Sequence, residues 1–86
     1  MAEAEQAIAA LRSRYAEGLA ATTAAEERVR YLRTERKRQR TLLAKGLGTQ
    51  ATLDAIEHDV RAAERRLEIQ QQTNRTLLAE LGGDAK

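Results

Sequence analysis

The chain has no cysteine, proline, phenylalanine or tryptophan, and only two of its 86 residues are tyrosine. Without cysteine it can form neither a disulfide nor a thiolate metal site, and the redox compartment is left open. With so few aromatic side chains and a third of its residues charged, the chain cannot build a thick globular core. No run approaches the roughly 20 apolar residues needed to span a bilayer. These absences leave helix-on-helix packing as the expected architecture.

Alanine, leucine, arginine, glutamate and glutamine dominate, and these residues lose least on entering a helix. The pattern is interrupted once, between Arg38 and Asp54, where Gly46 and Gly48 indicate a helix stop and a turn. The sequence therefore predicts an all-α fold, a two-helix antiparallel coiled-coil hairpin that forms a single domain. We expect a first helix over about 2–45 with 18–45 as its ascending arm, a tip turn over 46–49, a second helix over about 50–81 and a tail over 82–86.

Heptad counting supports two coiled-coil arms. Apolar residues recur at the a and d positions of both arms, although the first arm is weak in its middle. Thr49 or Thr52 can cap the start of the second arm, and Gly82 and Gly83 end it. The first arm places Ile8, Tyr15, Thr22, Val29, Arg36 and Leu43 at a, and Leu11, Gly18, Ala25, Leu32, Gln39 and Gly46 at d; the second places Leu53, Val60, Leu67, Asn74 and Leu81 at a, and Ile56, Ala63, Gln70 and Leu77 at d.

The short turn makes the arms antiparallel, and we expect residues that face each other across the seam to have numbers summing to about 99. Leu32 would then face Leu67, and Ala25 would face Asn74. Charges beside the seam provide a second test, because e faces e and g faces g between antiparallel helices. Exposed pairs contribute at most about 1 kcal/mol each, so they select the alignment more than they stabilise it. The opposite-charge pairs in this register are Arg40 with Glu57, Arg33 with Glu64, and Glu35 with Arg66.

The arms are unequal in this register. Gly18 faces Leu81, so residues 1–17 project beyond the second arm by a distance on the order of 25 Å at ~1.5 Å per residue. Two interpretations of this overhang stay open: a frayed end, or an apolar stripe that packs on a neighbouring chain. The apolar residues left without a partner in the chain would be Ile8, Leu11 and Tyr15.

Charge is distributed unevenly although the net charge is only +2. Eight residues between Arg28 and Lys45 are basic and one, Glu35, is acidic. Such a stripe can hold nucleic-acid phosphates, which is an alternative function. The stripe lacks the repeated aromatic residues that stack on bases, and the second arm is acidic. We therefore favour a solvated face, or a docking surface for an acidic protein, over nucleic acid. A purely structural dimerisation hairpin is a further alternative.

No residue pattern points to catalysis. The chain has no glycine-rich phosphate loop following a strand and no nucleophile arranged with a base. His58, the single histidine, falls at the exposed f position of the heptad, where an ordinary surface histidine is expected rather than a metal ligand. We expect a protein that is not an enzyme, with no catalytic residue, cofactor or metal site.

The tip holds residues that packing does not explain. Beyond the leucines of the seam, Leu42 at a g position and Leu47 within the turn are additional large apolar groups at the end of a rod. Exposed leucines of this kind indicate an interaction surface. Arg38 lies one helical turn before Leu42 on the same side, and the hydroxyl of Thr49 can either cap the second helix or bond to a partner. We predict that these four residues form a partner-binding tip.

The spacing Arg-x3-Leu-x6-Thr, formed by Arg38, Leu42 and Thr49, resembles the Arg-Leu-Ser tip motif of periplasmic adaptor proteins. These are the membrane-fusion proteins of the HlyD and AcrA type, which serve tripartite efflux pumps and type I secretion systems. Residues 61–67 are similar to the returning arm of their hairpins, and residues 81–84 to its end. The tip pattern Leu-Leu-x-x-Gly-x-x-(Ser/Thr)-x-x-x-Leu-Asp is matched by Leu42, Leu43, Gly46, Thr49, Leu53 and Asp54.

The resemblance implies that such hairpins stand side by side in a hexameric ring, as a tube in the periplasm whose tips meet a TolC-type outer-membrane channel. Arg38 would hydrogen-bond at the helical tips of the channel, Leu42 would fill an apolar notch between them, and Thr49 would supply the hydroxyl contact in place of the family's serine. The chain would be the hairpin of a larger adaptor, anchored in the inner membrane, that meets its transporter through other domains. Neither the transported substrate nor the transporter class follows from the resemblance.

Overall fold

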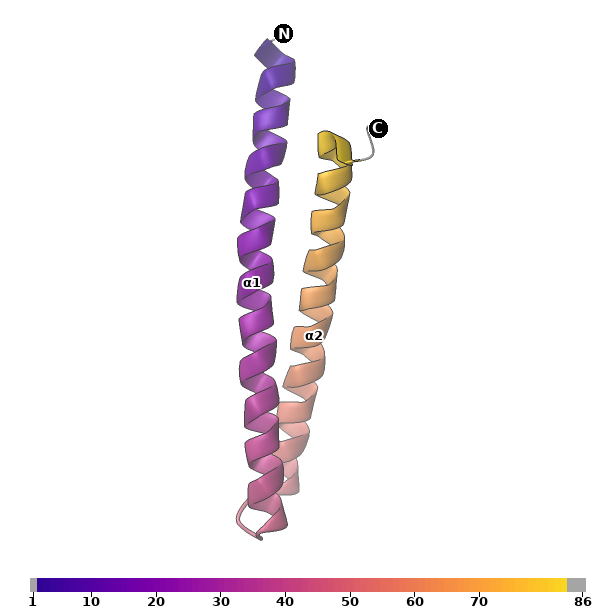
Figure 1. Ribbon diagram of the computed structural model, residues 1–86. Helices are drawn as coiled ribbons and strands as arrows, with labels where there is room; N and C mark the ends of the chain where they lie inside the picture. The colour runs from indigo at the N-terminus through magenta and orange to yellow at the C-terminus, as the bar shows by residue number, and fades with distance from the viewer. Residues whose placement is uncertain (1, 84–86) are drawn as a thin grey trace.

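The structure is a computed structural model that describes residues 2–83. Two helices, α1 (Ala2–Ala44) and α2 (Gln50–Leu78), run antiparallel and are joined by a short turn, as Figure 1 shows. A π-helical turn, η1 (Ala79–Gly83), continues α2. The result is a rod with extents of 67 × 20 × 15 Å and no strand among the described residues. The predicted all-α hairpin is confirmed.

The helical backbone of the second arm changes at Gly82, within η1. Gly82 has a φ of 100°, in the left-handed region that glycine adopts without the steric penalty of a side chain. This agrees with the expectation that the glycine pair ends the arm. Most of the expected tail, residues 84–86, lies outside the described residues, as does Met1.

The core is a narrow seam between the two helices. At its centre four buried side chains form one cluster, and Val60 within it has a relative exposure of 0%. No helix among residues 2–83 combines the length and the apolar character needed to cross a membrane. Every buried residue of the described chain lies at a predicted a or d position: Gly18, Val29 and Leu32 on α1, and Leu53, Val60, Ala63, Asn74 and Leu77 on α2. The heptad assignment is therefore correct.

The predicted alignment of Asn74 with Ala25 is wrong. Asn74 does not face Ala25; its Nδ2 donates a hydrogen bond to the Gly18 carbonyl oxygen at 3.0 Å. The numbers of the bonded residues sum to 92 for Gly18 with Asn74 and to 96 for Thr22 with Asn74, so α2 is displaced from the predicted alignment by less than one heptad. Leu32 and Val60 lie in one buried cluster, and Leu67 packs against it.

Hydrogen bonding explains why this register is preferred. A buried amide without partners costs about 1–3 kcal/mol, and Ala25 would offer Asn74 only a methyl group. In the observed register Nδ2 of Asn74 also donates to Thr22 Oγ1 at 2.6 Å, and Gln70 Nε2 donates to Asn74 Oδ1 at 2.9 Å. We call Gly18, Thr22, Gln70 and Asn74 the polar layer. It leaves no buried side-chain polar atom unsatisfied among the described residues.

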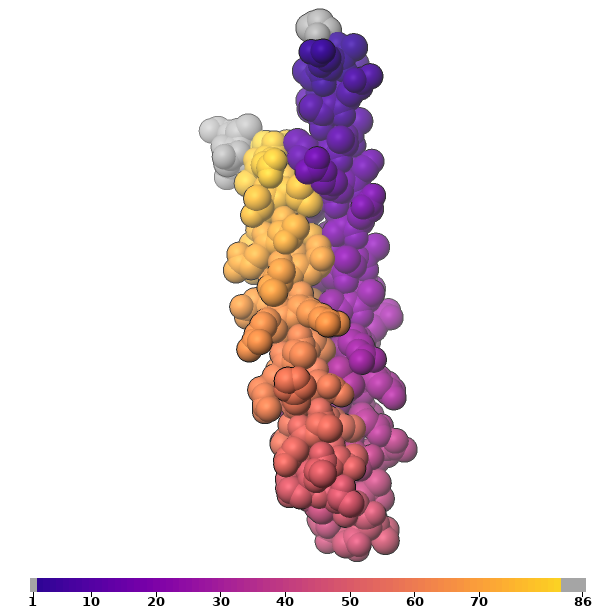
Figure 2. All heavy atoms as spheres, turned by 180° about the vertical axis from the view of Figure 1, so that it is seen from behind, coloured from indigo at the N-terminus to yellow at the C-terminus, as the bar shows by residue number. Residues whose placement is uncertain are grey.

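The observed alignment of α2 along α1 shortens the overhang of the first helix. Gly18 does not face Leu81, so residues 1–17 do not all project as predicted. Leu11 and Tyr15 are half-buried, and η1 contacts α1. Residues 2–10 are exposed, and the first turns of α1 stand clear of α2 in Figure 2. The expectation that Leu11 and Tyr15 lack partners is wrong, whereas Ile8 in the remaining overhang is 46% exposed.

Candidate partner-binding tip

The turn at the tip is built on a Schellman motif that ends α1. Gly46 has a φ of 75° and donates its N–H to the Leu43 carbonyl oxygen at 2.9 Å, while the N–H of Leu47 donates to the Leu42 carbonyl oxygen at 2.9 Å. These two bonds satisfy carbonyl groups that the end of a helix leaves free, and a left-handed glycine makes them possible. The backbone of the tip is therefore held in one defined turn by hydrogen bonds.

Gly48 folds back against the end of α1. A Cβ atom at this position would lie 3.3 Å from the backbone nitrogen of Leu43 and 3.5 Å from Cβ of Leu42. This close approach partly covers Leu42, which is half-buried. Leu42 therefore supports the turn, and only part of its side chain is available to a partner.

Leu47 is the most exposed large apolar side chain of the described chain, with a relative exposure of 73%. It occupies the position in the Schellman motif where an apolar residue often packs back onto the helix. Its exposure shows that this packing is slight, so the fold gains little from a leucine here. A large apolar group displayed at the end of a rod is the feature of the tip that stability does not explain.

Thr49 is the N-cap of α2. Its Oγ1 accepts a hydrogen bond from the N–H of Thr52 at 3.1 Å, and the two threonine hydroxyls are 2.8 Å apart. Of the two roles considered for Thr49, the structure assigns capping. A cap of this kind contributes about 1 kcal/mol to a helix. Thr49 is nevertheless exposed, so its hydroxyl lies at the surface of the tip.

Arg38 projects from α1 below the turn, with 66% of its side-chain surface exposed. It forms an ion pair with Glu35, one turn earlier on the same helix. The hydrogen bond from Arg38 lowers the pKa of Glu35 most, partial burial of the carboxyl opposes this, and a bond from Gln39 adds to the lowering. The same partnership raises the pKa of Arg38, which keeps its charge.

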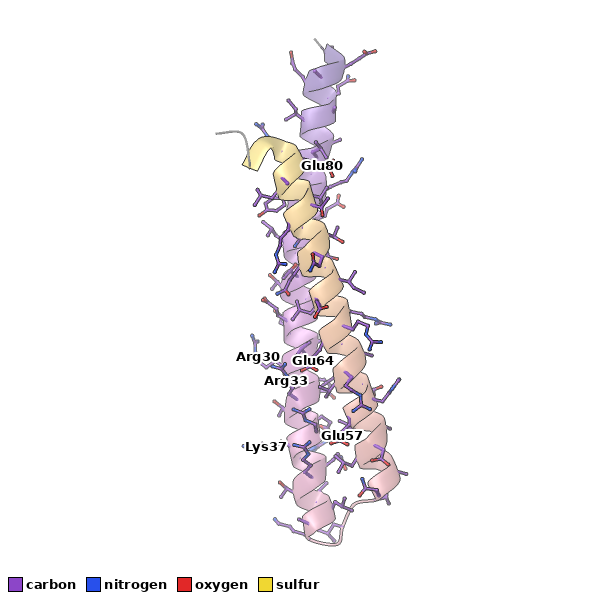
Figure 3. The ribbon with its side chains drawn as sticks, turned by 90° about the vertical axis from the view of Figure 1, so that its right-hand side faces the viewer. Arg30, Arg33, Lys37, Glu57, Glu64 and Glu80 are labelled. Atoms are coloured by element: carbon purple, nitrogen blue, oxygen red, sulfur yellow. The ribbon has the colours of Figure 1, made fainter. Side chains whose placement is uncertain are left out.

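Two of the three predicted register-setting pairs form. Arg40 Nη2 lies 2.9 Å from Glu57 Oε2, and Arg33 Nε lies 3.1 Å from Glu64 Oε2. The third, Glu35 with Arg66, is wrong, because Glu35 pairs with Arg38 on its own helix. Figure 3 shows Glu57 and Glu64 on α2, on the side that faces the basic residues of α1.

Sequence reasoning missed two features away from the tip. One is the polar layer, which was signalled by an asparagine at an a position and a glycine at a d position. The other is a groove of about 540 Å³ on the flank of α1, lined by Glu26, Val29, Arg30, Arg33, Thr34, Lys37 and Leu67. The basic stripe was visible in the sequence, but the apolar residues beside it depend on where α2 lies.

Comparison of the chain with protein-family models, with curated proteins and with solved structures found no match.

Proposed function

We propose that this hairpin is the tip-docking module of a periplasmic adaptor, which binds end-on to a TolC-type outer-membrane channel and supports efflux or export. The observation that carries the proposal is Leu47, 73% exposed at the end of the rod, within a turn whose sequence resembles the adaptor tip motif. In this proposal the hairpins assemble side by side in the periplasm, and the rest of the adaptor reaches the inner-membrane transporter.

In this proposal the tip residues have different roles. Leu47 is the apolar anchor, because its side chain is displayed without a structural role. Arg38 provides a charged donor group, oriented by Glu35 rather than free to rotate. Leu42 and Thr49 hold the turn and the start of α2, and they offer the partner only their outer surfaces. Binding through a pre-formed turn loses less conformational entropy than ordering a flexible loop.

The test replaces Leu47 with serine in the complete protein that carries this hairpin, and measures both export and cross-linking of the tip to the channel. We expect binding to weaken by about 5- to 150-fold, the effect of losing about 1–3 kcal/mol from an exposed anchor. Ile69→Ser is the matched control, because Ile69 is 58% exposed on α2 and lies away from the tip. Normal export and cross-linking with Leu47→Ser and Arg38→Asp would remove the tip assignment.

Thr49 separates capping from docking. Thr49→Ser keeps the hydroxyl and should preserve both the helix and the export function. Thr49→Ala loses the cap and should lower stability by about 1 kcal/mol. If Thr49→Ala lowers stability but leaves cross-linking intact, the hydroxyl serves the fold alone.

A further inference from the structure

The groove on the flank of α1 combines an apolar floor with a basic rim. Val29 is buried and Leu67 half-buried, and these two aliphatic side chains lie below the charged groups. In Figure 3, Arg33 and Glu64 lie close together between the helices, whereas Arg30 and Lys37 project from α1 on the side away from α2. The groove is therefore amphipathic, with aliphatic side chains at its floor and two cations along its α1 edge.

The charge of this groove is not balanced within the chain. Arg33 is neutralised by Glu64, and Glu26 is the single carboxylate among the lining residues. Neither Arg30 nor Lys37 takes part in an ion pair among residues 2–83. A surface with apolar area beside two unpaired cations matches a partner that offers apolar groups beside two anions.

We propose that this groove docks an acidic amphipathic helix of a partner protein, at a site separate from the tip. Arg30 and Lys37 are seven residues apart, or about 10 Å along α1. A partner helix that lies along the groove can place carboxylates at its positions i and i+7 beside Arg30 and Lys37. Its apolar side chains at i+3 and i+4 then contact mainly Leu67, because Val29 is only 4% exposed. The lining residues extend from Glu26 to Lys37, about 17 Å, so the partner helix needs at least about three turns.

Nucleic acid fits this groove less well. Phosphates can bind Arg30 and Lys37, but they provide nothing for the apolar floor. No aromatic side chain lines the groove for base stacking.

A second copy of this chain does not supply the required pattern. Its one pair of acidic residues seven apart is Glu57 and Glu64. Both carboxylates are bound by arginines of their own chain, and the aliphatic residue between them, Val60, is fully buried in the seam. The occupant is therefore a different protein, and the proposal does not depend on docking at the tip.

The test measures binding of the 86-residue chain to a synthetic acidic helix. The probe is a fluorescent three-heptad peptide with glutamates seven apart and leucines at the third and fourth positions after each glutamate. We expect saturable binding that weakens by at least about tenfold, or ~1.4 kcal/mol, with Arg30→Glu combined with Lys37→Glu. Arg65→Glu combined with Arg75→Glu makes the same change in net charge at exposed positions of α2 and should leave the affinity unchanged.

Further measurements distinguish this proposal from docking at the tip, from nucleic-acid binding and from self-association. Leu47→Ser at the tip should leave peptide binding intact, so this site and the tip can fail independently. A peptide in which serines replace the leucines should bind at least about tenfold more weakly if the apolar floor contributes. The proposal is overturned if the acidic peptide does not bind, or if the groove reversals leave its affinity unchanged. It is also overturned if an oligonucleotide binds these residues more tightly than the peptide does. The same holds if the chain forms a dimer and Arg30→Glu combined with Lys37→Glu dissociates that dimer.

Discussion

Replacing Gly18 with alanine should destabilise the hairpin, although alanine normally stabilises a helix. A Cβ atom at position 18 would lie 2.1 Å from Asn74 Oδ1 and 3.0 Å from Asn74 Cγ. The side chain of Asn74 must then rotate away and give up its bonds to the Gly18 carbonyl and to Thr22. Because Asn74 is 8% exposed, water cannot easily replace those partners.

The size of the effect follows from two opposing terms. Alanine in place of glycine within a helix stabilises by about 1 kcal/mol. Leaving the buried amide of Asn74 without its partners costs about 1–3 kcal/mol. Gly18→Ala should therefore lower the free energy of unfolding by up to about 2 kcal/mol, or a fall in Tm of about 4–8 °C per kcal/mol for a domain of this size.

A double-mutant cycle makes the reasoning testable. With Asn74→Ala the obstruction is gone, so Gly18→Ala should then stabilise by about 1 kcal/mol. The sign of the Gly18→Ala effect is thus expected to reverse between the two backgrounds, with a coupling energy of about 1–3 kcal/mol. Urea and thermal unfolding followed by circular dichroism measure each corner. Ala20→Gly, at an exposed position of α1, measures the cost of glycine in the helix without the contact to Asn74. Its effect on the free energy of unfolding should be the same in both backgrounds.

If Gly18→Ala stabilises the unmodified chain as much as it stabilises the Asn74→Ala chain, the two residues are not coupled. The polar layer would then not hold the register.

Two further predictions concern the core and the region below the tip. Val60→Ala should lower the free energy of unfolding by about 1.5–3 kcal/mol, because this side chain is fully buried. Ile69→Ala, at an exposed position, should change the free energy of unfolding by no more than about 0.5 kcal/mol. Equal effects of the two substitutions would contradict the assigned seam. Because the pKa of Glu35 is lowered in the folded chain, its ion pair with Arg38 contributes stability above the usual glutamate value of 4.5 and loses it as the pH falls below that value. The Tm difference between the unmodified chain and Glu35→Gln should therefore shrink on acidification, and a difference that stays constant would show that the pair is not formed.

The heptad pattern was sufficient to predict the seam, because burial in a coiled coil follows a repeat that can be counted along the chain. Even Gly18 and Asn74, which are not apolar, lie where the count places them. The pattern of one helix says which residues face inward. It does not say how far the partner helix is displaced along the axis, because every heptad presents a similar face.

Charge matching could not settle that displacement. The pairs of Arg33 with Glu64 and of Arg40 with Glu57 form although Asn74 is not aligned as predicted, so they do not distinguish the two alignments. Arginine side chains are also long enough to reach a partner that is not level with them. The exposed pairs with Arg33 and Arg40 therefore form in the observed register and were also consistent with the predicted one. The buried asparagine was the more selective signal, because a short amide tolerates few neighbours.

The tip shows why a motif alone does not identify the groups that bind a partner. The residue types at Leu42, Thr49 and the two glycines are those that a Schellman turn followed by an N-cap requires, so selection for the fold by itself could produce most of the pattern. Leu47 and Arg38 differ, because one is exposed without packing and the other is oriented by Glu35 beside the turn. Leu47 and Arg38 can be distinguished from the residues that the turn requires only after the backbone hydrogen bonds of the turn are assigned. Substitutions at these two positions therefore test docking with the least disturbance to the hairpin, whereas substitutions at Leu42 or Thr49 test docking and folding together.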